Sequence, residues 1–403
     1  MQSSFWKAGH LPTLFAAFLY FDLSFMVWIM LGPLAIVIAQ DLALTAAQKG
    51  LMVATPILSG ALLRVVMGIM VDRMKPKRAG AIGQLIVIIA LVGAWMLGIH
   101  TFQQVLVLGI FLGAAGASFA AALPLASRWY PPEHQGKALG IAGAGNSGTV
   151  LAALFAPSLA NWCGWANVFG LAAIPLAITF AVYMMLAKDN PQCPPAKPLT
   201  RYFQVLKDKD AWWFMFFYSV TFGGFVGLAA SLVIYFNDQY GLNAVVAGYF
   251  TAACVFAGSL VRPLGGMFAD RVGGIYSLLI MYTVAALCLF FASFGPGNVY
   301  LALALFVTAM LALGMGNGAV FQLVPQRFNR EIGVMTGLVG MAGGVGGFYL
   351  AYSLGYSKQL TGGYQMGLLM FASLAIVAVI GLSFVKGRWR ATWGAVDMIR
   401  AKI

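Results

Sequence analysis

Long hydrophobic segments alternate with short polar stretches along the whole chain of 403 residues. Breaking the chain at charged and Pro- or Gly-rich clusters predicts twelve apolar helices, many of them reaching the roughly 20 residues needed to cross a bilayer. We expect these segments near residues 11–40, 47–71, 79–99, 103–127, 138–162, 165–187, 210–238, 245–269, 275–294, 299–324, 333–357 and 362–386. Unbroken runs of Leu, Ala, Gly and Phe differ from the short alternating strands of a membrane β-barrel. The pattern therefore predicts an all-α polytopic membrane protein.

Composition agrees with this class. Only 9% of residues are charged and the mean hydropathy is +0.88, whereas soluble domains carry roughly 25% charged residues. The first segment is too long for the apolar part of a signal peptide, so we expect it to be a retained transmembrane helix.

Catalytic and metal chemistry find no support in the cysteines and histidines. The four cysteines show no CxxC spacing and are interpreted as small apolar fillers; the three histidines fall near segment ends without a metal-binding pattern. We expect no metal, no cofactor and no enzymatic activity. These residues are Cys163, Cys193, Cys254, Cys288, His10, His100 and His134.

The basic residues indicate an orientation. Of the 24 Lys and Arg residues, all except four lie in the N-terminus, the even-numbered loops, the linker near 188–209 or the C-terminal tail. Lys49 and Lys358 lie in odd-numbered loops, and Arg64 and Arg262 lie inside hydrophobic segments. By the positive-inside rule both termini and the linker are expected in the cytoplasm. The net charge of +13 then lies beside anionic lipid and indicates no nucleic-acid partner.

A repeat divides the chain into two parts. In "RVVMGIMVDRMKPKR" (64–78) and "RPLGGMFADR" (262–271), an arginine, a glycine and an Asp-Arg pair recur at an offset of 198. The glycine-rich stretches "GIAGAGNSG" (140–148) and "GLVGMAGGVGG" (337–347) recur at nearly the same offset. We therefore predict two pseudo-symmetric six-helix halves, residues 1–187 and 210–403, joined by a cytoplasmic linker at 188–209. Parallel repeats of this kind are typical of transporters whose halves rock against each other.

The two arginines of the repeat predict an anion site. Each lies eight residues from its aspartate, about 12 Å along a helix, and so near the middle of a hydrocarbon core of about 30 Å. A lipid-facing arginine there costs at least roughly 2.5–3.5 kcal/mol, so Arg64 and Arg262 are expected to face one central cavity. Asp22 is the only acidic residue deep within a predicted span, which leaves this cavity short of negative charge. Two planar guanidinium groups suit a small planar monoanion. The alternative is that each arginine pairs with a carboxylate or with helix-end carbonyls, Asp22 being a static partner of Arg64.

Sequence motifs add a resemblance. "GIMVDRMKPKR" (68–78) matches the loop motif G-x-x-x-D-R-x-x-x-K-R of the major facilitator superfamily, and "GMFADRVGG" repeats its first half. From segment one to segment eleven the chain resembles the nitrate/nitrite porter family, most specifically in the two glycine-rich stretches. "FDLSFMVW" (21–28), "YSVTFGGF" (218–225) and "GMGNGAVFQLVP" (314–325) are also similar to that family.

The resemblance implies a major-facilitator-like fold and a site for nitrate or nitrite. By position this site would use Arg64 and Arg262, with Asn146 and Tyr218 as hydrogen-bond donors. The second signature departs from the first, because Gly344 stands where the first has Asn146. Most of the glycines also suit close helix packing, and Asn146, like the weaker candidate Asn317, could instead form an interhelical hydrogen bond. The remaining candidates for lining the site are Phe25, Phe119, Phe222, Gly143 and Gly343.

The loop motifs are candidate gates. Their aspartates could cap helix ends across the interface between the halves, although the basic neighbours are equally explained by topology alone. The gating candidates are Gly68, Asp72, Arg73, Asp270 and Arg271.

We therefore expect a secondary transporter of nitrate or nitrite that works by alternating access in the bacterial inner membrane, functional as a monomer surrounded by lipid. Inward movement of an anion against an interior-negative potential costs about 2.3 kcal/mol per 100 mV. A co-transported proton carried by Asp22 could offset this cost, and so could exchange for an outgoing anion. A porter for another small anion remains the main alternative. A sensor, a channel or a cation-linked exporter of drugs fits the arginine pair and the duplication less well.

Overall fold

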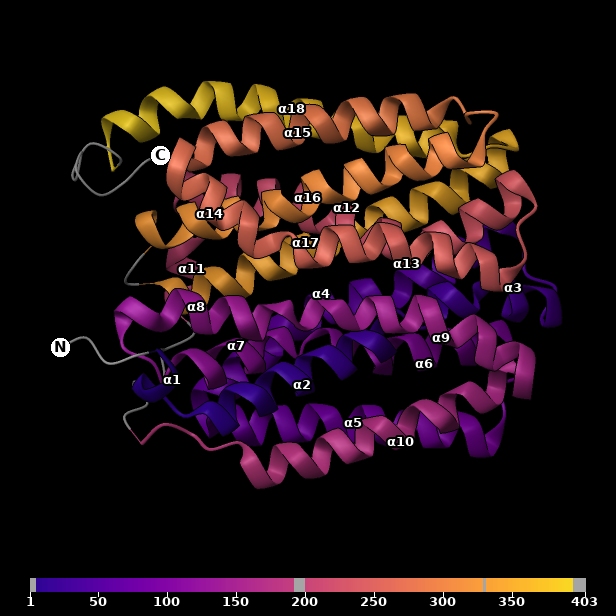
Figure 1. The fold of residues 1–403 in the computed structure, drawn as a ribbon, viewed down its shortest axis with the longest axis horizontal. Coiled ribbons are helices and arrows are strands. Elements are labelled where there is room, and N and C mark those ends of the chain that lie inside the picture. The colour runs from indigo at the N-terminus through magenta and orange to yellow at the C-terminus, as the bar shows by residue number, and fades with distance from the viewer. Residues whose placement is uncertain (1–4, 192–199, 329–330, 394–403) are drawn as a thin grey trace.

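The protein is a bundle of helices that run side by side along its long axis (Figure 1). The computed structural model describes residues 5–191, 200–328 and 331–393, and every regular element within these ranges is helical. The elements are α1 (Phe5–Ala8), α2 (Leu11–Ile29), α3 (Leu31–Asp41), α4 (Ala46–Met74), α5 (Pro76–Leu97), α6 (Phe102–Gly116), α7 (Phe119–Ser127), α8 (Pro132–Gly143), the 3-10 helix η1 (Ala144–Ser147), α9 (Gly148–Cys163), α10 (Trp165–Leu186), α11 (Thr200–Val205), α12 (Lys209–Tyr240), α13 (Ala244–Leu260), α14 (Arg262–Val272), α15 (Gly274–Ser293), α16 (Val299–Arg327), α17 (Ile332–Thr361) and α18 (Gln365–Ala391).

Eleven helices of the described chain are long and apolar enough to cross a membrane, or twelve if the bent pair α13 and α14 forms one span. The first, fourth and fifth spans are each built from consecutive elements: α2 with α3, α6 with α7, and α8 with η1 and α9. The predicted all-α polytopic class is confirmed, and each of the twelve predicted segments has a counterpart.

The elements fall into two groups. Elements α1 to α10 lie together on one side of the molecule and α12 to α18 on the other (Figure 1). We call the end where α1 and α11 lie the linker end, and the opposite end, which carries the α3–α4 and α17–α18 connections, the far end. The predicted linker lies partly outside the described residues, because 192–199 are not among them; the prediction for Cys193 is outside them as well.

Glycine contacts bring each helix that precedes or carries a repeated arginine against a neighbouring helix. Gly60 and Gly258 each lie four residues before their arginine. A Cβ on Gly113 of α6 would lie 2.6 Å from the backbone nitrogen of Gly60, and one on Gly314 of α16 would lie 2.0 Å from the carbonyl oxygen of Gly258. The backbones therefore touch in both halves, as small residues at helix interfaces permit.

The two arginine helices differ in shape. Helix α4 continues straight through Arg64, whereas α13 and α14 meet at an angle of 41° where Arg262 begins α14. Pro263 follows Arg262 and has no N–H to continue the helical ladder; the corresponding position in the first half is Val65. At the two arginines, the halves are therefore more similar in sequence than in helix geometry.

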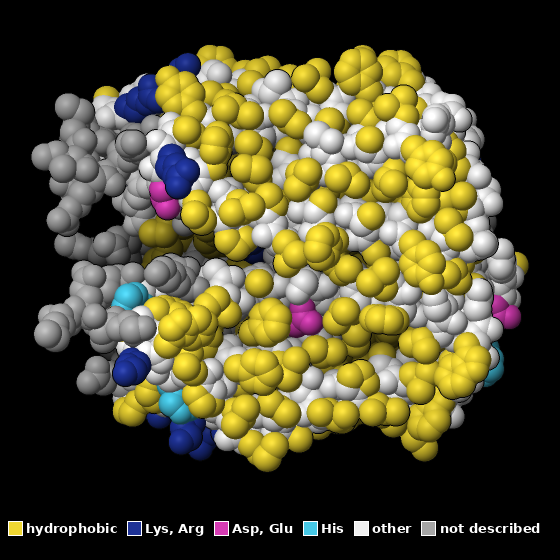
Figure 2. Space-filling model, viewed as in Figure 1, with side chains coloured by type: hydrophobic (Ala, Val, Ile, Leu, Met, Phe, Trp, Pro, Cys, Tyr) yellow, Lys and Arg dark blue, Asp and Glu magenta, His cyan; other side chains and the backbone are white. Residues whose placement is uncertain are grey.

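The halves are in closest contact at the far end. Helix α4 packs along α17, α3 along α12, and α9 along α13. A Cβ on Gly355 of α17 would lie 2.6 Å from the Cα of Gly50 of α4. At the linker end, α8 packs on α2, α7 and η1, and α14 on α13, α15 and α16, which all belong to their own halves. Figure 2 shows a recess between the halves at this end, with a basic side chain visible at its inner margin. The bundle is closed at the far end and more open at the linker end.

Candidate anion-binding site

Arg64 lies deep between the halves with its guanidinium only partly satisfied. The side chain is 1% exposed. Its Nε donates to the carbonyl oxygen of Gly116 (3.1 Å), and its Nη1 donates to that of Gly340 (2.5 Å) on α17 of the second half. Its Nη2 has no hydrogen-bond partner among the described residues. Arg64 therefore connects the two halves and keeps one donor group unused.

Aromatic rings enclose the Arg64 guanidinium. Its central carbon lies 4.8 Å from the ring centre of Phe222, 5.2 Å from that of Trp28 and 5.5 Å from that of Phe119. Trp28 is held in place because its indole N–H donates to the carbonyl oxygen of Pro56 (2.7 Å). These ring faces attract the cation, but they provide no anionic charge.

Arg262 approaches the same place from the bend between α13 and α14. Its Nη2 lies 3.4 Å from the hydroxyl oxygen of Tyr218, and its central carbon lies 5.4 Å from the ring centre of Phe321 and 5.8 Å from that of Phe119. Its Nη1 is buried and has no hydrogen-bond partner in the described parts of the chain. Phe119 thus contacts both arginines, and the predicted convergence of Arg64 and Arg262 on one site agrees with this geometry.

Neither arginine forms an ion pair with a carboxylate within the described parts of the chain. Asp22, the expected alternative partner of Arg64, instead accepts a hydrogen bond from the hydroxyl of Ser147 in η1 (2.6 Å) and is 7% exposed. The alternative in which Asp22 neutralises Arg64 is therefore wrong for this conformation. Each arginine keeps one buried N–H group that a small anion could accept from.

The other predicted donors occupy different positions. Tyr218 contacts Arg262 directly and stacks on Phe222 with ring centres 5.2 Å apart. The Oδ1 atoms of Asn146 in η1 and Asn317 in α16 are both buried, and neither has a hydrogen-bond partner among the residues that the structure describes. Asn317 lies one helical turn before Phe321 on α16, and therefore on the face that approaches Arg262.

Glycines of the two signatures mainly make room for neighbours. A Cβ on Gly148 would lie 1.7 Å from the carbonyl oxygen of Asp22, and one on Gly343 would lie 2.6 Å from the ring of Tyr218. Gly343 therefore supports a ring of the site without reaching the arginines itself. Gly143 has open space around the position of a Cβ. At the position that corresponds to Asn146, Gly344 lies against Ala61 of α4.

The predicted phenylalanines divide into two kinds. Phe119 and Phe222 lie against the arginines, as described above. Phe25 is buried against Phe21 and Trp28, with ring centres 4.3 and 4.6 Å away, and supports the site from behind Trp28. Phe321 was not singled out from the sequence, although it lies within a quoted motif. The carbonyl groups of Gly116 and Gly340 carry no side-chain signal.

The gating candidates lie at the linker end. Asp72 pairs with Arg128 (3.5 Å), a residue at the end of α7 in the same half. Arg73, Asp270 and Arg271 are exposed, and Gly68 is partly buried. The ion pair of Asp72 lies within one half, and the expected contact of the motif aspartates across the interface stays a prediction.

The described cavities lie away from the arginines. One of about 10 Å³ lies at the far end, and one of about 220 Å³ lies at the linker end beside Asp208, Arg327 and Phe328. Arg64 and Arg262 line neither cavity. The candidate site is therefore defined by the guanidinium groups of Arg64 and Arg262, against which Phe119 and Phe222 pack.

Comparison with known proteins agrees with this fold. The family model of the major facilitator superfamily matches residues 15–351. The chain belongs to the major facilitator superfamily. It is 34% identical to the probable nitrate/nitrite transporter NarK2 of Mycobacterium tuberculosis, over 88% of this chain and 91% of that protein. It is 29% identical to the nitrite extrusion protein of Bacillus subtilis, over 89% and 90% of the two chains. Within the superfamily the chain is thus a member of the nitrate/nitrite porter family, which confirms the resemblance.

A solved structure supports the fold alone. A bacterial homologue of the human lysosomal transporter Spinster, in an inward-facing and occupied conformation, matches with a TM-score of 0.69 and 18% identity. The match covers 95% of this chain and 97% of that one. The chain is therefore an integral membrane transporter of this superfamily, and the prediction that it is not an enzyme is confirmed by its family.

Removal of one unpaired cation should stabilise the protein. In buffer without nitrate or nitrite, we expect Arg262→Met to raise the free energy of unfolding by about 1 kcal/mol, because a partly buried charge with no carboxylate partner among the described residues opposes folding. The measurement is thermal or chemical unfolding of the purified protein in detergent. The control is Arg327→Met, which removes a cation paired with Asp208 (2.5 Å) and Asp210 (2.9 Å). This control should lose about 2 kcal/mol. A similar loss in Arg262→Met would mean that Arg262 is a structural residue.

Proposed function

We propose that the protein transports nitrate, nitrite or both by alternating access, with the anion bound between Arg64 and Arg262. The observation that carries this proposal is that two guanidinium groups, that of Arg64 buried and that of Arg262 partly buried, share one aromatic enclosure, have no carboxylate partner among the described residues, and each keep a buried nitrogen without a hydrogen-bond partner. A planar oxyanion accepts hydrogen bonds from such groups within its own plane. Relatives with 34% and 29% identity are named for nitrate or nitrite.

Contacts of Arg64 with both halves would couple anion binding to the position of one half relative to the other. The Nη1 of Arg64 already donates to Gly340 in the second half, while its Nε donates to Gly116 in the first. An anion accepting from Nη2 would be held by Arg64 from one half and by Arg262 and Tyr218 from the other. A bound monoanion would halve the net positive charge of the arginine pair and so favour closure of the halves, because like charges repel most strongly where water is excluded.

Proton-coupled uptake is our proposal for the energy source, with Asp22 as the proton carrier. Asp22 is the only Asp or Glu deep within a span of the described chain. Its hydrogen bond from Ser147 links α2 to η1 at the break in the fifth span. The second candidate is exchange of nitrate for nitrite. Exchange is favoured because Asp22 bonds to Ser147 and forms no ion pair with either arginine in the described chain. A relative from Thermus thermophilus, 28% identical, is named a probable nitrate/nitrite antiporter.

The remaining parts of the proposal concern placement in the cell. The concentration of basic residues at the linker end supports a cytoplasmic location for that end in a bacterial inner membrane. Residues 1–187 and 210–403 would be the two moving bodies, and the linker-end motifs around Asp72 and Asp270 would close the recess when the far end opens. A single chain contains both arginines, which supports function as a monomer.

Arginine geometry can be tested with the charge preserved. Arg64→Lys and Arg262→Lys should each lower nitrate uptake into proteoliposomes at least tenfold, because an ammonium cannot donate two coplanar hydrogen bonds. Arg390→Lys at the end of α18 is the matched control and should transport like the parent protein. Parent-like transport by both site variants would contradict the proposed binding mode.

The energy source can be tested by separating the driving forces. Nitrate uptake is measured into two sets of liposomes. One set has a lower pH outside than inside and contains no internal nitrate or nitrite; the other is preloaded with nitrite and has equal pH on both sides. We expect Asp22→Asn to abolish pH-driven uptake and leave exchange nearly intact. Ser147→Ala removes the hydrogen bond but keeps the carboxyl group, so pH-driven uptake should persist. Parent-like pH-driven uptake in Asp22→Asn would exclude Asp22 as the proton carrier.

A further inference from the structure

An ion pair joins the two halves at the far end. The Lys49 ammonium on α4 lies 3.0 and 3.3 Å from the carboxylate oxygens of Asp238 on α12. The phenol of Tyr364, just before α18, donates to the same carboxylate (2.7 Å). The side chains of Lys49 and Asp238 are 18% and 16% exposed, so water screens this pair only partly.

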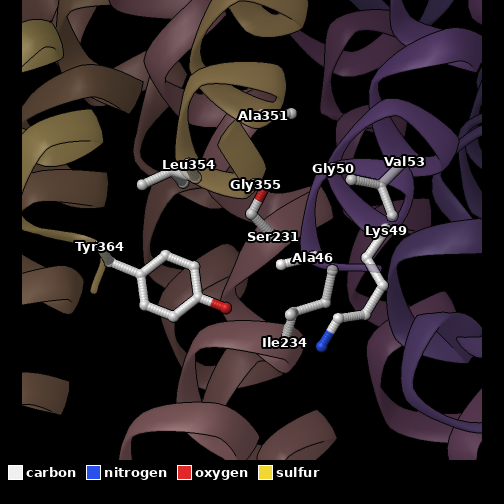
Figure 3. Close-up of a pocket in the computed structure, with 10 residues that line it drawn as sticks. All are labelled: Ala46, Lys49, Gly50, Val53, Ser231, Ile234, Ala351, Leu354, Gly355 and Tyr364. Carbon is white, nitrogen blue, oxygen red and sulfur yellow. The ribbon is translucent and has the colours of Figure 1, made fainter. Parts of the chain in front are cut away.

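Both basic residues that the sequence assigns to the far end meet here. Lys49 comes from the first half, and the ammonium of Lys358, from the second, lies 5.3 Å from the ring centre of Tyr364. Figure 3 shows the side chains of Lys49 and Tyr364 reaching from opposite halves toward the same crevice. The phenol remains a donor, because burial, together with the Asp238 carboxylate, raises the pKa of Tyr364 well above its usual value.

The crevice beneath the ion pair is nearly filled. Its volume is about 10 Å³, about the space of one water molecule, and Gly50 and Gly355 bring the backbones of α4 and α17 into contact beside it. Any movement that separates these helices also pulls Lys49 away from Asp238. Tyr364 and Asp238 belong to the same half and can remain bonded during such a movement.

We propose that Lys49, Asp238 and Tyr364 form a far-end latch, an ion pair between the halves that holds the far end closed and breaks each time that end opens. This inference rests on the proposed alternating-access mechanism, though not on the identity of the anion. A partly buried ion pair suits this role: it is stronger than an exposed pair and, unlike a fully buried one, its charges regain water readily on separation.

The test measures how often the far end opens. Val53 lines the crevice and is 2% exposed, so a cysteine at this position reacts with a membrane-impermeant maleimide only when the halves separate. Val53→Cys is placed in a chain whose four native cysteines are replaced, and its labelling rate is measured in proteoliposomes without substrate. Asp238→Asn and Lys49→Gln should each label roughly fivefold to tenfold faster, the size expected for loss of a partly buried, hydrogen-bonded ion pair.

Two controls make the result specific. Asp41→Asn removes another far-end acid, whose carboxylate accepts from the Trp165 indole (3.0 Å) within the first half, and should leave the labelling rate unchanged. The double variant Lys49→Asp with Asp238→Lys should restore slow labelling, which a merely misfolded single variant could not do. An unchanged rate in Asp238→Asn, equal acceleration by Asp41→Asn, or fast labelling in the charge swap would overturn the latch. Because no anion is present, these outcomes are separate from any failure of nitrate as the substrate.

Discussion

Two guanidinium groups between the halves, one buried and one partly buried and both without a carboxylate partner in the described chain, are the constraint on which the rest of this structure depends. Burial of a charge is costly unless a counter-charge or several hydrogen bonds accompany it. Arg64 and Arg262 receive carbonyl, phenol and aromatic contacts, but within the described chain no carboxylate reaches them. The folded protein therefore retains a favourable place for negative charge, and a mobile anion can fill it without being held permanently. A fixed carboxylate would stabilise the bundle and remove the reason to bind a substrate.

Helix packing makes this arrangement possible. Gly60 and Gly258 bring the helix segment before each arginine into backbone contact with a neighbouring helix. The positions of the two arginine backbones therefore depend on this close helix packing. The departure from symmetry at Pro263 bends the second helix where Arg262 begins it. Two related sequences thereby present one arginine from a straight helix and one from a bend. The guanidinium groups of Arg64 and Arg262 both contact the ring of Phe119. The far end stays closed where the backbones of Gly50 and Gly355 touch.

Much of this was accessible from the sequence. The spans, the inward orientation of Arg64 and Arg262 and the lack of a second acid follow from hydropathy and from the cost of burying charge. The structure adds contacts that depend on tertiary packing. Nothing in a side-chain pattern identifies a backbone carbonyl such as that of Gly340 as a partner of Arg64. The bond from Ser147 to Asp22 joins positions 125 residues apart, and only the packing of η1 on α2 brings them together.

The most direct measurement is the melting temperature of the purified parent protein as a function of anion concentration at constant ionic strength. If the anion supplies the missing charge, nitrate or nitrite should raise the melting temperature progressively as the site fills, following RT ln(1 + [L]/Kd), while gluconate at equal concentration should not. Equal melting temperatures in nitrate and gluconate across the whole concentration range would contradict the account, because the two arginines would then gain nothing from a small planar anion.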